Sequence, residues 1–402
     1  MIRPRVQAIL DEVRKSGDEA LLNYARELDG VELASLTVTP EETGRAVRNV
    51  DPALADAIRM AAQNIERFHR AQEFPGIELR IAEGITCSQR SVPIQKVGLY
   101  VPGGSAPLFS TVLMLAIPAR IAGCREIVLC TPPNKEGRVA DAILFAAHLC
   151  GVTKIIKAGG AQAIAAMAYG TESVPKTDKI FGPGNQYVTV AKQLVSVSDA
   201  AIDMPAGPSE VMVMADESAD ARFVAADLLS QAEHGPDSQA ILVTDSRALA
   251  EEVEKQVRLQ IKELSRGELV EKSIGNSRIL ILEDPSEMVE MANTYAAEHL
   301  ILSMQNAWQV AEKITAAGSI FIGNYTPESA GDYASGTNHT LPTNGWAASY
   351  SGVNLDSFMR KITYQEITRE GLEKLGGVIE TMAVAEGLDA HAQAVRIRLK
   401  RG

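Results

Sequence analysis

The chain has 402 residues, of which 46% are hydrophobic, 5% aromatic and 22% charged, and its formal net charge is −12 at pH 7. This length is sufficient for more than one hydrophobic core, and the hydrophobic content excludes an intrinsically disordered chain. The excess of Asp and Glu argues against nucleic acid as the main partner, since neutralising phosphates requires clustered Lys and Arg. No uncharged apolar stretch approaches about 18 residues, so we expect neither a membrane span nor a membrane partner.

The first part of the chain is predicted to be helical. Apolar residues recur every three or four positions from about 3 to 28 and from about 41 to 72, and Asp51-Pro52 predicts a helix start within the second stretch. The N-terminal stretch lacks the apolar run of a secretory signal. The four cysteines form no CxxC pair, which predicts free thiols in a reducing cytoplasm. They are Cys87, Cys124, Cys130 and Cys150.

From Val92 onward, short apolar runs alternate with helical patterns, which is typical of right-handed βαβ units with parallel strands. The expected strands of a first block cover residues 97–101, 127–130, 154–157 and 179–181. Those of a second block cover residues 210–214, 240–243, 278–282, 299–302 and 319–322. The sequence therefore predicts an α/β protein with two doubly wound, incomplete Rossmann-like parallel sheets, each with a crevice at the carboxyl ends of its strands.

We expect the chain to divide into two α/β domains and a tail. The first domain combines the N-terminal residues 1–99 with residues 210–350, and the second covers residues 100–209. The tail, residues 351–402, is expected to contain a helix from about Thr363 to Ala385. Residues 324–339 are rich in Gly, Ser, Thr and Asn and too numerous for an ordinary turn, which is typical of a functional loop.

Three glycine turns follow expected strands of the first block, namely Gly103-Gly104, Gly159-Gly160 and Gly182-Pro-Gly184. Such a turn lets a ligand approach the backbone beside a helix N-terminus, which favours an anion. None of the turns matches GxGxxG or a P-loop, so each one alone is also typical of an ordinary α/β fold. Together they favour a nucleotide-sized ligand, because they are followed by the polar residues Ser105, Gln162 and Asn185.

Two of the six histidines, His69 and His148, lie in helical patterns and are interpreted as structural. The other four stand beside polar or acidic residues, and they are His234, His299, His339 and His391. Gln231 and His234 are three residues apart at a helix end, so both can point the same way. With one carboxylate, for which Asp332 is the candidate, and one more imidazole, they would form a mixed N/O site for zinc or a similar metal. No HExxH or CxxC motif fixes this geometry, so a structural role for each histidine remains open.

Glu298 and His299 are adjacent at an expected junction between a helix and a strand. Adjacent residues project in different directions at such a junction, so two proton-transfer groups could serve opposite sides of one substrate. The alternative interpretation is a surface pair at an element boundary.

Five segments resemble motifs of the histidinol dehydrogenase family, and the resemblance extends from about Arg3 to His391. The segments are YVPGGSAPLFS from Tyr100, FGPGN from Phe181, DMPAGPSE from Asp203, LSQAEHGPDS from Leu229 and SAGDYASGTNH from Ser329. The resemblance implies an enzyme that oxidises L-histidinol to L-histidine through the aldehyde with two molecules of NAD. This reaction is the last step of histidine biosynthesis.

The resemblance also implies roles for individual residues. One zinc ion per subunit would be bound by Gln231, His234, Asp332 and His391. The acid/base pair would be Glu298 and His299. The substrate would be held by the zinc ligands and His299 together with Ser209, His339 and Glu386. In the 100–209 domain, NAD would be contacted by Tyr100, Gln162 and Asn185.

A homodimer is implied as well, in which the tail, residues 351–402, crosses to the partner subunit. Glu386 and His391 would then complete the neighbour's site.

Two alternatives remain open. A related enzyme on the same scaffold would oxidise a different amino- or sulfo-substituted alcohol, although Ser209, His339 and Glu386 match the histidinol pattern. A regulatory protein would bind NAD or metal without catalysis, although the complete ligand set argues against it.

Overall fold

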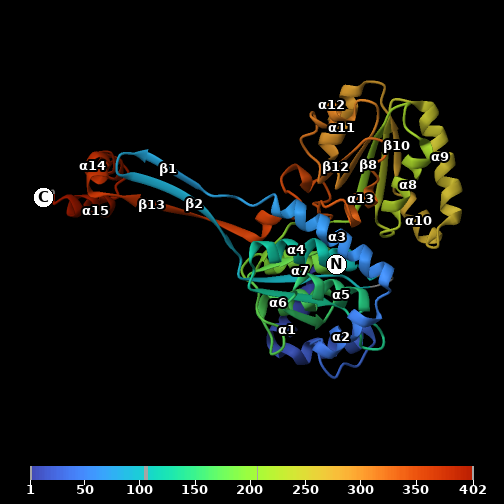
Figure 1. Ribbon diagram of the computed structural model, residues 1–402, viewed down its shortest axis with the longest axis horizontal. Coiled ribbons are helices and arrows are strands. Elements are labelled where there is room, and N and C mark those ends of the chain that lie inside the picture. The colour runs from blue at the N-terminus through green and yellow to red at the C-terminus, as the bar shows by residue number, and fades with distance from the viewer. Residues whose placement is uncertain (1, 104–106, 206, 401–402) are drawn as a thin grey trace. The chain divides into compact units, whose positions relative to one another are not determined.

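The computed structural model describes residues 2–103, 107–205 and 207–400 (Figure 1). Contacts divide the chain into two compact units, Met1–Gln72 with Ile94–Phe358, and Glu73–Pro93 with Met359–Gly402. The first unit contains two five-stranded sheets and the second a three-stranded sheet. The predicted α/β fold with two parallel sheets is therefore confirmed. Gly104 and Ser105 of the first glycine turn lie outside the described residues.

The first sheet has the strand order β5-β4-β3-β6-β7, and all of its pairings are parallel. Its strands are β3 (Lys96–Tyr100), β4 (Glu126–Thr131), β5 (Lys154–Lys157), β6 (Lys179–Phe181) and β7 (Ala201–Ile202). Its helices are α4 (Phe109–Ala122), α5 (Asp141–Cys150), α6 (Gly160–Tyr169) and α7 (Gln186–Val195). The chain builds outward from β3 to β5 and then returns to the other side of β3. The strand order thus reverses between β3 and β6, which is where doubly wound sheets bind ligands.

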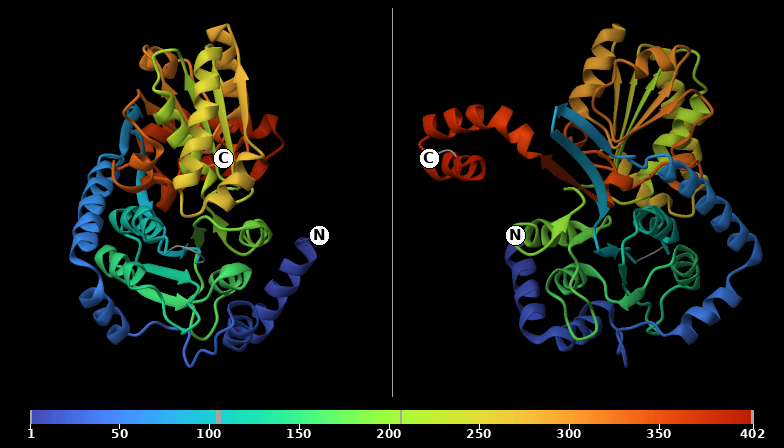
Figure 2. Two further views of the ribbon diagram at one scale, coloured as in Figure 1. Left: turned by 90° about the vertical axis from the view of Figure 1, so that its right-hand side faces the viewer. Right: turned by 60° about the vertical axis from the view of Figure 1, so that its left-hand side comes forward.

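The second sheet repeats this topology in the order β10-β9-β8-β11-β12, again all parallel (Figure 2). Its strands are β8 (Glu210–Ala215), β9 (Gln239–Thr244), β10 (Arg278–Ile281), β11 (His299–Ser303) and β12 (Ser319–Ile322). Its helices are α8 (Ala221–Ala232), α9 (Arg247–Gln260), α10 (Gly267–Ile274), α11 (Pro285–Tyr295), α12 (Ala307–Ala311) and α13 (Glu328–Tyr333). Helix α13 falls within residues 324–339, so the expectation of a purely irregular loop there is corrected.

Four N-terminal elements precede the first sheet, namely α1 (Arg3–Tyr24), a π-helical turn η1 (Ala25–Asp29), α2 (Pro40–Asn49) and α3 (Pro52–Arg70). The Asp51 carboxylate accepts hydrogen bonds from the N–H groups of Ala53 and Leu54, as expected of a helix start there. Helix α1 packs on α6 and α7, while α2 and α3 pack on α4 and α5. These helices, with β3, thus contact the sheet built from residues 100–209. The predicted grouping of residues 1–99 with residues 210–350 in one domain stays a prediction.

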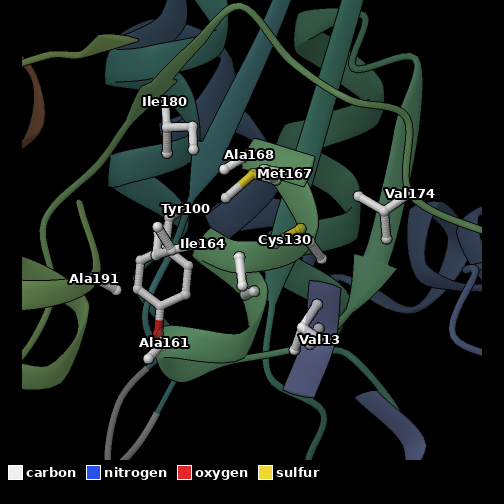
Figure 3. Close-up of a cluster of buried hydrophobic side chains, with 14 of the residues drawn as sticks. Val13, Tyr100, Cys130, Ala161, Ile164, Met167, Ala168, Val174, Ile180 and Ala191 are labelled. Carbon is white, nitrogen blue, oxygen red and sulfur yellow. The ribbon is translucent and has the colours of Figure 1, made fainter. Parts of the chain in front are cut away.

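The core of the first sheet is formed by apolar side chains from both helices and strands (Figure 3). Ile164 and Met167 of α6 cluster with Cys130 of β4 and Val13 of α1, and all are almost fully buried. Burial raises the pKa of the Cys130 thiol to about 12, so this thiol stays protonated at neutral pH. All four cysteines are free, as predicted.

Among the described residues, no helix has the length and apolarity needed to cross a membrane. The cytoplasmic location stays a prediction.

The second unit was only partly anticipated. It contains an antiparallel sheet in the order β1-β2-β13, followed by two helices. The elements are β1 (Ile77–Ala82), β2 (Ile85–Pro93), β13 (Met359–Ile367), α14 (Arg369–Ala385) and α15 (Asp389–Leu399). The expected helix from Thr363 is therefore wrong at its start, because residues 363–367 extend a strand paired with β2. Every residue of β1 is exposed, so the burial that guides strand prediction is missing here.

Candidate active site

The side chains of Glu298 and His299 are placed at the amino edge of the second sheet. Helix α11 ends at Tyr295, Ala296 adopts a left-handed conformation with φ of 52°, and β11 begins at His299. In the parallel ladder His299 pairs with Val211 of β8, so Ser209 belongs to the same edge. The predicted junction of helix and strand is confirmed. The site nevertheless lies at the opposite edge from the crevice we expected for this sheet.

Glu298 and His299 are buried, with exposures of 7% and 4%, so the alternative of a surface pair is excluded. The Glu298 Oε2 atom accepts a hydrogen bond of 3.0 Å from the Glu210 N–H and lies 3.8 Å from His299 Nδ1. Burial raises the pKa of Glu298 to about 7, while the neighbouring His299 opposes the shift. A carboxyl group with such a pKa can accept or release a proton near neutral pH.

The His299 ring is surrounded by carboxylates. Its Nδ1 atom lies 3.9 Å from Glu328 Oε1, and its Nε2 atom lies 3.4 Å from Asp332 Oδ1. Neither ring nitrogen has a hydrogen-bond partner of good geometry among the described residues. Burial lowers the pKa of His299, but Glu298, Glu328 and Asp332 outweigh it and raise the pKa to about 10. At neutral pH the ring is therefore positively charged and balances the charge of the ionised carboxylates beside it.

Three of these side chains converge as a group able to hold a metal ion. Ligand atoms of His234, Glu328 and Asp332 all lie within 4.8 Å of one another. His234 Nε2 is 4.0 Å from Asp332 Oδ2, and the His234 side chain is half-exposed, which leaves one side of the group accessible. Imidazole and carboxylate donors of this kind suit zinc and similar divalent metals.

Gln231 belongs to the same cluster and is completely buried. With its amide nitrogen turned toward Glu328, it donates a hydrogen bond to Glu328 Oε1, and its oxygen accepts one of 3.1 Å from the Glu210 N–H. The structure thus brings together three of the predicted metal ligands, Gln231, His234 and Asp332. Gln231 lies in the last turn of α8, as predicted, and His234 follows just beyond the end of that helix.

Sequence reasoning missed two carboxylates of this cluster. Glu328 is 1% exposed, and burial raises its pKa well above the usual range. Asp227 of α8 accepts a hydrogen bond from the Glu328 N–H, and burial raises its pKa to about 7. Glu328 and Asp332 are four residues apart on α13, so helical spacing would have placed them on one face had the helix been anticipated. No comparable signal in the sequence marks Asp227.

His339 lies beside this cluster. Its Nδ1–H donates a hydrogen bond of 2.8 Å to the Asp332 carbonyl, because a carbonyl can only accept. Its Nε2 atom, 3.2 Å from Thr111 Oγ1, is therefore the acceptor of the threonine hydroxyl. Burial lowers the pKa of His339, which keeps this neutral tautomer in place. Thr111 of α4 is a further residue at the site that the sequence did not reveal.

The residues expected to contact a dinucleotide lie at the carboxyl edge of the first sheet. The Tyr100 hydroxyl accepts a hydrogen bond of 3.0 Å from the Gly160 N–H, which links β3 to the start of α6. Gln162 is 3% exposed, and its Oε1 atom has no partner among the described residues. Such a buried acceptor is costly unless a ligand or water satisfies it. Asn185 caps α7 by accepting from the N–H groups of two following residues.

Glu386 and His391 lie in the second unit, where Glu386 directly follows α14 and His391 lies in α15. Their expected roles in substrate and metal binding are therefore not tested by the contacts of the first unit. The functional cluster of the first unit consists of Glu298, His299, Asp332 and their neighbours.

Comparison with known proteins gives one consistent result. The sequence model of the histidinol dehydrogenase family matches residues 1–399. The curated histidinol dehydrogenase of Bacteroides thetaiotaomicron is 61% identical over 394 residues, which cover 98% of this chain and 92% of the relative. The curated histidinol dehydrogenase of Escherichia coli K12 is 52% identical over 396 residues, which cover 98% of this chain and 90% of the relative. The crystal structure of histidinol dehydrogenase from Elizabethkingia anophelis superposes with a TM-score of 0.97 at 50% sequence identity. The superposition covers 100% of this chain and 92% of that chain.

The buried Asp227 generates a prediction about stability and pH. Because its folded pKa of about 7 exceeds the value near 4 of an unfolded chain, the folded state is penalised increasingly as pH rises between these values. Asp227→Asn should therefore raise the free energy of unfolding at pH 8 by about 1–3 kcal/mol and by less at pH 4.5. Urea denaturation of variant and parent at both pH values measures the difference.

Asp220 at the start of the same helix serves as a control, because its substitution is expected to change the free energy of unfolding in the opposite direction. Arg222 lowers the pKa of Asp220 to about 2, so Asp220→Asn should destabilise the protein at pH 8. A destabilising effect of Asp227→Asn at pH 8, or an effect that does not change with pH, would contradict the prediction.

Proposed function

Because the chain belongs to the histidinol dehydrogenase family, we propose that it oxidises L-histidinol to L-histidine through L-histidinal, as the final step of histidine biosynthesis. One alcohol, two NAD+ and one water give one carboxylate, two NADH and three protons. The observation that supports this proposal most directly is the buried Glu298–His299 pair facing Asp332. It combines two proton-transfer groups with a donor set for a metal ion.

The two residues would divide the proton transfers between them. His299 would accept the hydroxyl proton in the first oxidation, when hydride leaves the carbinol carbon. A cation bound at Asp332 would offset the carboxylates that raise the pKa of His299 to about 10, so that the ring can be neutral and act as this base. Glu298 would activate the water that hydrates the aldehyde before the second hydride transfer, since its pKa of about 7 suits a general base at neutral pH. The Glu210 N–H holds the Glu298 carboxylate in place at 3.0 Å. Their burial excludes bulk water, which would otherwise compete for the same protons.

We propose that one zinc ion per subunit is bound by Gln231, His234, Asp332 and His391 of the partner subunit. The donor set fits, since two imidazoles, an amide oxygen and a carboxylate are hard and borderline ligands. The crowded carboxylates also indicate that positive charge belongs here. When bound, zinc supplies a clamp for the imidazole and amino groups of histidinol and neutralises part of the carboxylate field.

The remaining residues would bind and orient substrate and cofactor. Ser209 and His339 stand beside the cluster, and Glu386 of the partner subunit would complete the substrate contacts. Tyr100, Gln162 and Asn185 would contact NAD+ at the switch point of the first sheet. The buried, unpartnered Oε1 atom of Gln162 supports this, because a hydroxyl of the dinucleotide can satisfy it.

We also propose a homodimer in which the second unit contacts the partner subunit. The second unit exposes apolar side chains on its sheet and helices that it cannot bury by itself. On the sheet they are Ile77, Leu79, Ile81, Ile362, Tyr364 and Ile367, and on the helices Val378, Met382, Val384 and Ile397. A second copy of the chain is the occupant that would also bring Glu386 and His391 to the metal cluster.

The reaction predicts a stoichiometry. The purified protein should form two NADH for each L-histidinol consumed, and a chelator should abolish this activity until zinc is restored. Absorbance of NADH and chromatographic assay of histidine measure both quantities. One NADH per substrate, with accumulation of the aldehyde, would contradict the four-electron reaction, and turnover of another amino or sulfo alcohol in place of histidinol would contradict the substrate.

Two substitutions separate metal binding from proton transfer. Asp332→Ala removes a ligand, so zinc content and activity should be lost together. His299→Gln leaves the ligand set intact, so zinc should be retained while histidinol turnover falls by about 10²–10⁴-fold. Metal analysis after gel filtration and initial rates check both expectations. Parental turnover by His299→Gln would show that the assigned base is wrong.

Mixing two inactive variants tests the shared site. If His234 and His391 of the partner subunit belong to one site, His234→Ala and His391→Ala are each inactive as homodimers. Random co-assembly should then restore about one quarter of the parental sites, because half of the dimers carry one intact site. Equal amounts of the two variants, unfolded and refolded together, are assayed against each variant refolded alone. No recovered activity in mixed dimers would place both histidines in one chain.

A further inference from the structure

A buried ion pair lies beneath the loop that joins β6 to α7. Lys192 of α7 and Asp203, which follows β7, form a salt bridge, and their side chains are 5% and 1% exposed. Both partners also bind the same glycine. The Lys192 Nζ atom donates a hydrogen bond of 2.9 Å to the Gly182 carbonyl, and the Gly182 N–H donates one of 2.8 Å to Asp203 Oδ2. The pair therefore fixes both backbone polar groups of one residue.

Gly182 occupies a position where only glycine fits. Its φ of +123° is one that residues with side chains rarely adopt, and a Cβ atom here would lie 2.1 Å from the Tyr100 carbonyl oxygen. The glycine backbone thus packs directly on the end of β3. Tyr100 in turn accepts the hydrogen bond from Gly160, two residues before Gln162. Through Gly182, the ion pair links all three loops that carry the proposed NAD+ contacts.

The pair is unusual as a means of stabilisation alone. Removing two charges from water is costly, and well-packed apolar residues often replace such pairs without loss of stability. Here the charges instead give Gly182 a donor and an acceptor of fixed direction, which apolar side chains cannot supply. Asp203 also accepts a hydrogen bond of 2.7 Å from the Met204 N–H, so the strand end after β7 is held by the same carboxylate.

We propose that Lys192 and Asp203 are positioning residues for NAD+. They hold the backbone of residues 182–185 in the position in which this loop can contact the dinucleotide at the switch point of the first sheet. This inference rests on the proposed function, since it takes Tyr100, Gln162 and Asn185 as cofactor contacts. Both charged groups are buried, so neither would touch the cofactor itself. They act through the backbone of Gly182 and through Asn185, which follows it by three residues.

Two variants of the full-length, zinc-loaded protein test the proposal. Asp203→Asn keeps the shape and one acceptor, and Lys192→Met keeps the length of the side chain without its charge. Both should raise the dissociation constant of NADH and the KM for NAD+ about ten- to a hundredfold, because small displacements of a binding loop have effects of this size. The KM for histidinol and the zinc content should stay at parental values. Fluorescence titration of NADH and initial rates measure these quantities.

The control is Arg14→Met, which removes an ion pair between α1 and Asp199 in the same part of the fold. This pair is more exposed, and its loss should leave NADH binding unchanged. A purely structural role of Lys192 and Asp203 would lower the fraction of folded protein, seen as fewer binding sites of parental affinity. That result, or parental KM values in both folded variants, would overturn the inference about Lys192 and Asp203 and leave the proposed function untouched. Failure of the parental protein to bind NADH would overturn the proposed function as well.

Discussion

The concentration of carboxylates around the buried His299 ring is the constraint on which the site depends. Glu298, Glu328 and Asp332 all raise the pKa of this imidazole against the effect of burial. Holding so many acidic groups away from water is costly unless positive charge and hydrogen bonds compensate. The fold supplies part of the compensation through the Glu210 N–H, the Gln231 amide and the imidazole itself. The remainder calls for a cation, so the electrostatics of the cluster and the proposed metal binding would have the same structural origin.

The same topology is used at opposite edges in the two sheets. In the first sheet the proposed cofactor residues follow β3, β5 and β6, at the carboxyl edge where the strand order reverses. In the second sheet the proposed proton-transfer pair lies where β11 begins, at the amino edge, with Ser209 just before β8. Parallel pairing of β8 with β11 sets Ser209 and Glu210 beside Glu298 and His299, although almost ninety residues separate them. A buried central pair of strands thus serves as a rigid frame for the proposed proton-transfer groups.

Much of this arrangement could be predicted from the sequence, because parallel strands buried on both faces give continuous apolar runs separated by helices. The pair at 298–299 and the proposed ligands Gln231, His234 and Asp332 carried motif signals as well. Glu328 and Asp227 did not, since their importance arises from burial beside each other, which is a property of the folded chain. The strand β13 was missed at Thr363 because its side chains are exposed on both faces, so no alternation marked it. Amino-edge placement of the site runs against the general rule for such sheets.

The second unit shows why assembly and catalysis would be coupled in the proposed dimer. A three-stranded sheet is stable only when one of its faces is covered, yet β1 is exposed throughout and β13 nearly so. The helices α14 and α15 bury few residues, mainly small ones such as Gly376 and Ala392. In the proposed dimer the unit would gain its stability from the surface of the partner subunit. Because Glu386 and His391 are carried on this same unit, the contact that covers its apolar side chains would also deliver the last metal ligand, and an unassembled chain would be incomplete in both respects.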